Sequence, residues 1–320
     1  MKKEIKEKLE SQHYGFAGKH TAVKICTWTK KSLRDEGVCY KQKFYGIKSH
    51  RCCQMSPSVN FCQNNCVFCW RTQEDTEGFK EMTKEQADNP KEIIDKCIEA
   101  QRKLLTGFGG NPKTNIEKFK EAQNPNQFAI SLTGEPTLYP YLSELISELH
   151  KRNNTTFLVS NGQSPDVLER IEPPTQLYIS LDAPNKKTFL SIDRPKLKDG
   201  WERLNKSLEV MNQLAQKTRT VIRITLIKGL NDIEPENYAK LIEKANPHFV
   251  EVKAYMFVGA SRQRLSLKNM PYHSYVKEFS ERITRHCNYK IIDEKEESRV
   301  VLLGENKPRI SPKIDFFSSH

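Results

Sequence analysis

Short apolar segments alternate along this chain with longer amphipathic segments. Six of them have the length and the β-branched composition of buried or half-buried strands. They lie near residues 56–61, 128–133, 155–160, 176–182, 220–227 and 248–257. Helical periodicity fills the intervals, near residues 91–105, 138–152, 164–171, 200–217 and 235–245. This alternation predicts the α/β class, with a parallel sheet and crossover helices. Six units are fewer than a complete β/α barrel contains, so we expect a partial (β/α)6 barrel with an open side for a large substrate.

Residues at both ends of the chain lie outside the predicted barrel. We expect an N-terminal extension over residues 1–55, a core over residues 56–260 and a C-terminal extension over residues 261–320. The C-terminal part contains a helical pattern near 272–286 and the short strand VVLL. Residues 106–127, rich in Gly, Asn, Pro and Lys, predict a loop over the core.

Hydropathy and the charged N-terminus argue against a membrane-spanning or a secreted protein. No apolar run approaches the length of a membrane span, and the charged start MKKEIKEKLESQ lacks the apolar stretch of a secretory signal. We therefore expect a cytoplasmic protein without a membrane partner. The formal net charge of the 320 residues is +12.

Much of that positive charge lies in residues 19–51, which contain nine Lys or Arg and two acidic residues. Aromatic residues are interleaved with these charges, a combination that suits an RNA backbone with unpaired, stacked bases. A plain solvated basic surface explains the charge equally well, and the aromatics could be core. The candidate stacking residues are Trp28, Phe44, Tyr45 and Trp70.

The chain has nine cysteines, an odd number that in a cytoplasmic protein argues for metal binding rather than disulfides. Cys62, Cys66 and Cys69 follow the first predicted strand directly, at the end where barrel enzymes carry their chemistry. Three thiolates can hold three irons of a [4Fe–4S] cluster and leave the fourth iron open. A zinc site or core cysteines are the alternatives.

The CxxxCxxC spacing resembles the signature of the radical S-adenosylmethionine superfamily. The resemblance implies that S-adenosyl-L-methionine chelates the open iron and yields a 5′-deoxyadenosyl radical. It also places the aromatic Phe68 near the adenine.

Polar residues follow the next predicted strands, where the same superfamily holds its cofactor. The segment SLTGEP resembles the family's GGEP-type segment, with Thr133 in place of the first glycine, and its Gly134 and Glu135 backbone would receive the methionine amino group. Ribose and carboxylate contacts are expected from the residues at the following strand ends, and a weaker candidate lies on the fifth strand. These residues are Ser160, Asn161, Ser180, Asp182 and Arg223.

Three upstream cysteines, Cys26, Cys39 and Cys52, are spaced thirteen positions apart in the basic stretch. They could hold a second [4Fe–4S] cluster, whose open iron could chelate a small substrate. Cys53 is a rival for Cys52, and zinc is a rival metal. Cys97 and Cys287 lie in helical patterns and are expected to be core residues.

The run from CTWTKK to CVFCWR resembles the N-terminal signature of the tRNA 4-demethylwyosine synthases, as do QHYGF, SLTGEPTLYP and SLDAP, over about residues 11–285. This resemblance implies action on N1-methylguanosine at position 37 of phenylalanine tRNA. The radical would abstract hydrogen from the N1-methyl group, and the carbon radical would add to pyruvate, which loses its carboxylate carbon before ring closure.

A lysine that holds pyruvate as a Schiff base would activate the pyruvate carbonyl, and this requires a neutral amine. Lysines flank the second cysteine triplet, and among them we favour Lys41, beside Cys39, with Lys30 as a second amine. The alternative is that these lysines only face RNA phosphates.

The remaining expectations concern partners. The compact chain resembles the archaeal type without a fused flavodoxin domain, so we expect an external electron donor such as flavodoxin or ferredoxin, and a monomer that binds the anticodon loop of the tRNA. Two rival interpretations remain at this stage. One is a radical enzyme that acts on another RNA base or on a protein, and the other is a zinc-stabilised RNA-binding protein.

Overall fold

In a computed structural model, which describes residues 1–74 and 76–314, the chain is built on one ten-stranded sheet. The strands lie in the order β1-β2-β3-β4-β5-β6-β7-β8-β10-β9, so the first and last strands do not pair. Six central strands are parallel to one another, which confirms the prediction of a partial (β/α)6 barrel with an open side. They are β3 (Cys52–Ser56), β4 (Gln127–Ile130), β5 (Thr155–Ser160), β6 (Gln176–Ser180), β7 (Arg219–Leu226) and β8 (Phe249–Ala254).

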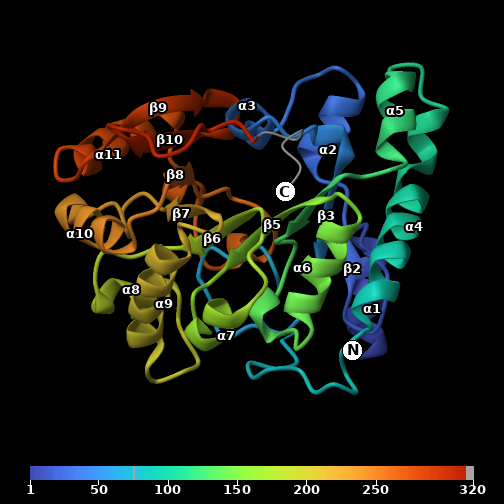
Figure 1. Ribbon diagram of the computed structural model, residues 1–320, viewed down its shortest axis with the longest axis horizontal. Helices are drawn as coiled ribbons and strands as arrows, with labels where there is room; N and C mark the ends of the chain where they lie inside the picture. Colours follow the sequence, from blue (N-terminus) through green and yellow to red (C-terminus); the bar gives the residue numbers. More distant parts are fainter. Residues whose placement is uncertain (75, 315–320) are drawn as a thin grey trace.

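Helices connect these strands and cover the outer face of the sheet (Figure 1). The crossovers contain α4 (Pro90–Gly109), α5 (Ile116–Ala122), α6 (Leu142–Lys151), α7 (Pro165–Arg170), α8 (Lys186–Ile192), α9 (Gly200–Leu214) and α10 (Pro235–Ala245). Side chains of a strand alternate between its two faces. On β5, Leu158 therefore joins the core under the helices, whereas Phe157 joins a second cluster on the inner face. Apolar residues on both faces explain why these strands read as continuous apolar runs.

The first core strand lies earlier in the chain than the sequence predicted. β3 ends at Ser56, so the predicted strand over residues 56–61 is wrong. Pro57 has no N–H for the strand ladder, and Asn60 adopts a positive φ of 68°, so residues 57–61 bend away from the sheet. Cys52 consequently lies on the sheet itself, and the boundary expected between residues 55 and 56 falls within β3.

Both ends of the described chain extend the same sheet. After α1 (Lys3–Ser11), the strands β1 (Gly15–Phe16) and β2 (Ala22–Val23) form an antiparallel pair that joins β3. Beyond β8, α11 (His273–Thr284) precedes β9 (Tyr289–Lys295) and β10 (Val300–Glu305), and β10 pairs antiparallel with β8. The last six residues of the expected C-terminal extension lie outside the described residues.

Two short helices of the N-terminal part lie close to the sheet. α2 (Thr27–Leu33) and α3 (Tyr40–Tyr45) follow Cys26 and Cys39, which are their respective N-caps. The aromatic rings of α3 pack on the inner face of the sheet, and α3 lies beside β9 (Figure 1). No helix of the described chain combines the length and the apolar character needed to cross a membrane.

Candidate functional site

The first cysteine triplet lies on the loop that follows β3. Backbone hydrogen bonds fix this loop at both ends: Cys62 N donates to Gly78 O at 2.9 Å, and Val67 N donates to Ile192 O at 2.8 Å. The Arg264 side chain donates to the carbonyls of Val67 and Cys69. The three thiols are free and half-buried, so the loop presents them together at the carboxyl edge of the sheet.

Charged side chains surround these thiols. The buried guanidinium of Arg71 interacts electrostatically with all three, and they raise the pKa of Arg71 even though burial lowers it. The Cys66 thiol lies 3.5 Å from Asp193 Oδ1, while Asp193 Oδ2 is buried without a hydrogen-bond partner in the described part of the chain. Burial, together with the nearby charge of Asp182, raises the pKa of Asp193. Arg71 is the last residue of the quoted run CVFCWR, but the sequence assigns it no role, and Asp193 lies outside every motif quoted.

The segment after β4 packs directly against the first triplet loop. Gly134 has a φ of 74°, and a Cβ there would meet Ser58 O at 2.0 Å, so only glycine fits this close approach. Glu135 N donates to Phe61 O at 2.7 Å, and the carbonyl of the preceding Thr133 accepts a hydrogen bond from Ser56. The predicted segment therefore lies beside the cysteine loop.

The Glu135 carboxylate ties this segment to the end of β5. It accepts hydrogen bonds from Ser160 Oγ at 2.9 Å, Thr137 Oγ1 at 2.8 Å and Asn161 N at 2.8 Å. Burial raises the pKa of Glu135, although these donors stabilise its ionised form. The side chain of Asn161 reaches the first triplet, with Nδ2 3.8 Å from Cys62 Sγ.

The ends of β6 and β7 complete this edge. Ser180 ends β6, and the buried Asp182 accepts a hydrogen bond from Thr225 N at 2.6 Å. Burial raises the pKa of Asp182 to about 6. Phe68 packs with Val67 in a small apolar cluster beside the loop.

Arg223 lies deeper than its expected role beside the cofactor implies. It lies on β7 opposite Glu251 of β8, in register, and interacts electrostatically with Tyr40, Glu251, Tyr178 and Asp182. Its guanidinium therefore lies between the carboxyl edge and the inner face of the sheet.

The second triplet assembles beside that inner face. The electrostatic neighbours of Cys52 include Cys26 and Cys39, which come from the starts of α2 and α3. Cys53 points to the opposite face of β3 and is fully buried in the core with Cys97, as expected for Cys97. The structure therefore groups Cys52, and not its rival Cys53, with the upstream cysteines.

Lys41 points into the aromatic cluster on the inner face. Its Nζ lies 5.0 Å from the centre of the Phe157 ring and 4.7 Å from that of Tyr178. Burial lowers the pKa of Lys41, and Glu251 opposes this effect. Lys30, in contrast, is only half-buried on α2. Sequence reasoning missed Lys253 on β8, whose pKa burial lowers to about 8.

The buried aromatic and charged side chains around Lys41 on the inner face of the sheet are here called the inner chamber. Glu251 holds several of them in place through hydrogen bonds. It is fully buried and accepts hydrogen bonds from three tyrosines, Tyr45 at 2.7 Å, Tyr40 at 3.0 Å and Tyr178 at 3.1 Å. Tyr45 and Phe44 are buried core residues, the alternative to base stacking that the sequence left open for them.

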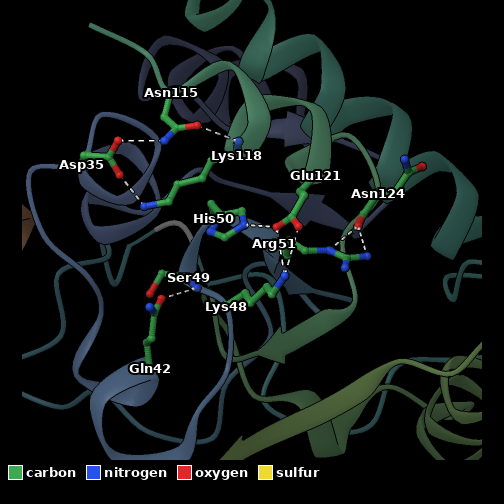
Figure 2. A network of polar contacts seen from close by, with 10 residues as sticks. All are labelled: Asp35, Gln42, Lys48, Ser49, His50, Arg51, Asn115, Lys118, Glu121 and Asn124. Carbon is green, nitrogen blue, oxygen red and sulfur yellow. Dashed lines mark hydrogen bonds and ion pairs between the residues drawn. The ribbon is translucent and has the colours of Figure 1, made fainter. Parts of the chain in front are cut away.

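A network of polar contacts joins α5 to the segment just before Cys52 (Figure 2). Glu121 contacts Lys48 Nζ at 3.0 Å and His50 Nε2 at 2.5 Å. Ser49 lies between these residues, and its hydroxyl accepts a hydrogen bond from Cys39 N at 2.9 Å. Its carbonyl accepts one from Thr29 Oγ1 at 3.0 Å, and that hydroxyl is 3.2 Å from Cys26 Sγ. The segment thus links all three cysteine positions to α5.

Each triplet offers three free thiols, which fit the donor set of an iron–sulfur cluster. Within the described residues, no three His, Cys, Asp or Glu side chains are grouped so that they could hold a metal ion. A [4Fe–4S] cluster binds its thiolates through separate irons, so its ligands need not converge on one point.

Comparison with known proteins gives consistent matches. Residues 114–242 match the radical SAM superfamily, and residues 244–305 match the family described as wyosine base formation. The S-adenosyl-L-methionine-dependent tRNA 4-demethylwyosine synthase of Pyrococcus horikoshii is 52% identical over 308 residues, 95% of this chain and 89% of that protein. The enzyme of the same name from Methanocaldococcus jannaschii is 43% identical over 314 residues, 97% and 99% of the two chains. A solved structure of TYW1 with a lysine-pyruvate adduct bound matches with a TM-score of 0.88 and 41% identity, over 98% of this chain and 99% of that one.

Proposed function

We propose a reaction for this chain on the premise that it belongs to the tRNA 4-demethylwyosine synthases, a family of radical S-adenosyl-L-methionine enzymes. The chain converts N1-methylguanosine at position 37 of phenylalanine tRNA, with pyruvate, into the tricyclic base 4-demethylwyosine. Membership of the radical SAM family implies one [4Fe–4S] cluster and S-adenosyl-L-methionine. The observation that carries the pyruvate step is the buried amine of Lys41 beside the second thiol triplet.

Cys62, Cys66 and Cys69 would hold the first cluster. When bound, this cluster and S-adenosyl-L-methionine together supply a 5′-deoxyadenosyl radical. The residues of this chain would orient the cofactor: the backbone of Gly134 and Glu135 would receive its amino group, and Phe68 would pack near the adenine. Its ribose and carboxylate would be contacted by Ser160, Asn161, Ser180 and Asp182. The buried donors around Glu135 support this arrangement because they fix the strand ends relative to the cysteine loop.

Cys26, Cys39 and Cys52 would hold a second [4Fe–4S] cluster. Lys41 would attack the carbonyl carbon of pyruvate and form a Schiff base with loss of water, which requires a neutral amine. Burial among aromatic rings favours the neutral form of this amine. Lys253 and Lys41 have the same charged neighbours, Glu251 and Arg223. Lys253 is therefore a better candidate than Lys30 for a second amine beside pyruvate.

We further propose that Arg223 acts between the two sites rather than on the cofactor alone, because its neighbours include both Asp182 and Glu251. The chain acts as a monomer in the cytoplasm on the anticodon loop of its tRNA. A low-potential donor such as flavodoxin or ferredoxin supplies the electron.

The deciding experiment uses anaerobically reconstituted protein with a reductant, S-adenosyl-L-methionine, carbon-labelled pyruvate and tRNA that carries N1-methylguanosine at position 37. Mass spectrometry of the digested tRNA should find the tricyclic base with two labelled carbons, and Cys66→Ala should abolish it. Cyanoborohydride should trap pyruvate on the wild-type chain at Lys41 and not on Lys41→Ala. A colourless, zinc-containing protein that makes no base would instead support the zinc-stabilised RNA-binding interpretation.

A further inference from the structure

The segment of residues 256–272, here called the rim, follows β8 and lies directly on the loop of the first triplet. Ala260 N donates to Trp70 O at 2.9 Å, and Arg264 Nε donates to Val67 O at 3.1 Å. Gly259 has a φ of 58°, and a Cβ there would meet Trp70 O at 2.4 Å, so the rim depends on glycine to approach the loop this closely. Residues 259–264 of the rim therefore lie beside the loop of the first triplet.

Large apolar side chains of the rim are exposed. Tyr272 is 73% exposed, Leu267 61%, Val258 49% and Met256 40%. The neighbouring loop after β7 adds Leu230 and Ile233, which are 38% and 41% exposed. This loop touches the rim, because Lys228 N donates to Asn269 O at 3.0 Å and Asn269 Nδ2 donates back to Lys228 O at 3.0 Å. Exposed apolar side chains gathered in this way mark interaction surfaces.

The rim is also basic without any acidic residue. Residues 256–272 contain three Lys or Arg and no Asp or Glu. Arg262 and Lys268 are exposed, and neither has an acidic partner within 4.0 Å among the described residues. In the basic stretch of residues 19–51, by comparison, Lys48 pairs with Glu121 and Lys43 pairs with Asp293. The rim thus presents two exposed positive charges that no acidic side chain neutralises in the described structure.

We propose that the rim binds the unpaired nucleotides of an RNA loop, with Arg262 and Lys268 on phosphates and Tyr272 stacked on a base. Flexible cations beside exposed aromatic and aliphatic side chains suit a single-stranded RNA segment, which offers both phosphates and base faces. The contact with the first triplet loop places such RNA where a nucleotide can reach the radical site. This inference rests on the proposed function and identifies the face that receives its tRNA.

The test measures the affinity of reconstituted protein for a hairpin RNA with the sequence of the methylated anticodon arm. The variant Arg262→Glu/Lys268→Glu should bind the hairpin at least about tenfold more weakly. The slope of its affinity against salt concentration should also fall, by the amount expected for the loss of about two phosphate contacts. Tyr272→Ala should also bind roughly tenfold more weakly, with an unchanged salt dependence. The matched control Lys151→Glu/Lys217→Glu reverses two exposed charges at the opposite, amino edge of the sheet and should bind like wild type. Iron content and melting temperature confirm that each variant is folded.

Unchanged hairpin affinity in both rim variants would overturn the inference. Normal hairpin affinity with impaired reduction by flavodoxin would also overturn it, because the rim would then bind a protein donor. If wild-type protein makes the tricyclic base while the rim variants bind normally, only the rim assignment fails. If wild-type protein neither binds the hairpin nor makes the base, the proposed function fails with it.

Discussion

Single buried residues set the chemistry of the inner chamber. Glu251 is the one negative side chain that the inner face of β8 presents toward Lys41, Arg223 and Lys253 in the described structure. Three tyrosine hydroxyls satisfy its oxygens and hold the carboxylate in place. A buried cation without such a carboxylate would be costly, because the desolvation of its charge would not be offset.

Replacement of Glu251 should therefore destabilise the fold. Glu251→Gln keeps the size of the side chain but removes its charge, and we expect a loss of about 3 kcal/mol in the free energy of unfolding. Urea unfolding of the metal-free protein measures this loss. The exposed Glu281→Gln on α11 is the control and should change the midpoint little. Equal midpoints for the two variants would show that Glu251 does not offset the buried cations.

At the scale of elements, α5 supports the second triplet from outside the barrel. Figure 2 shows Glu121 of α5 in contact with both Lys48 and His50. These two residues shortly precede Cys52 in the chain. Arg51 adds hydrogen bonds to Asn124 O at 2.9 Å and 3.0 Å. These contacts fix the segment from which Ser49 holds the Cys39 backbone.

Loss of the Glu121 contacts should loosen this segment. In Glu121→Gln we expect faster hydrogen exchange at residues 48–52 and lower iron incorporation at the second triplet, with the first triplet unaffected. Glu117→Gln is the matched control, because Glu117 lies on the same helix and pairs only with the exposed Lys120 among the residues described. The comparison requires iron analysis and hydrogen-exchange mass spectrometry. Identical exchange in both variants would contradict a supporting role for α5.

A histidine at the start of β8 makes the pairing of β7 with β8 dependent on pH. His248 Nδ1 lies 3.1 Å from Thr220 N, which donates to it, and His248 N donates to Thr220 Oγ1 at 3.2 Å. Burial, together with the charges of Arg309 and Arg219, lowers the pKa of His248 to about 4, against the opposing effect of Glu305.

The unfolded chain therefore binds a proton at His248 below its ordinary pKa of about 6.5, whereas the folded chain resists protonation down to about pH 4. Stability from this site is complete above about pH 6.5 and falls as the pH drops toward 4, by on the order of 2 kcal/mol. Urea unfolding at about pH 7 and pH 5 should show a smaller difference for His248→Asn than for wild type. An identical difference would exclude His248 as the source.

Sequence patterns predicted the regular elements better than the short ones. The periodicity located the five strands after β3 and the longer helices, because apolar side chains on both faces leave a clear signal. It placed the first strand too late, because the apolar letters of residues 59–61 belong to a turn set by Pro57 and Asn60. It also predicted a loop where α5 forms. There Asn115 is the N-cap of the helix, and its side chain accepts a hydrogen bond from Lys118 N at 3.1 Å.

At the scale of the whole molecule, one sheet connects two thiol sites. The first triplet lies at the carboxyl edge, and the second lies beside the inner face, where Cys52 of β3 is close to Lys41. Between them, Arg223 interacts with Asp182 on one side and Glu251 on the other. Spacing along the sequence identified the candidate cysteines, whereas Lys41 follows from what the family resemblance implies and from its place beside Cys39. Spacing could not reveal Asp193, Glu251 or Lys253, because strands and loops far apart in the chain bring these residues to the two sites.

If each cysteine triplet holds one cluster, the protein should have a specific iron content. Anaerobically reconstituted wild-type protein should contain about eight irons, four for each cluster of the kind assigned to such thiolate sites. Substitution of Cys62, Cys66 and Cys69 by alanine should leave about four irons and abolish cleavage of S-adenosyl-L-methionine. Substitution of Cys26, Cys39 and Cys52 should also leave about four irons, but uncoupled cleavage should continue while base formation stops.

The control is Cys287→Ala, because Cys287 is half-buried and packs against the core far along the chain from either triplet. It should keep about eight irons. A wild-type content of about four that falls to none only in the first triple variant would leave the upstream cysteines as free thiols or zinc ligands. The lysine alone would then have to hold pyruvate, and its burial among Phe157 and Tyr178 would be the remaining source of its reactivity.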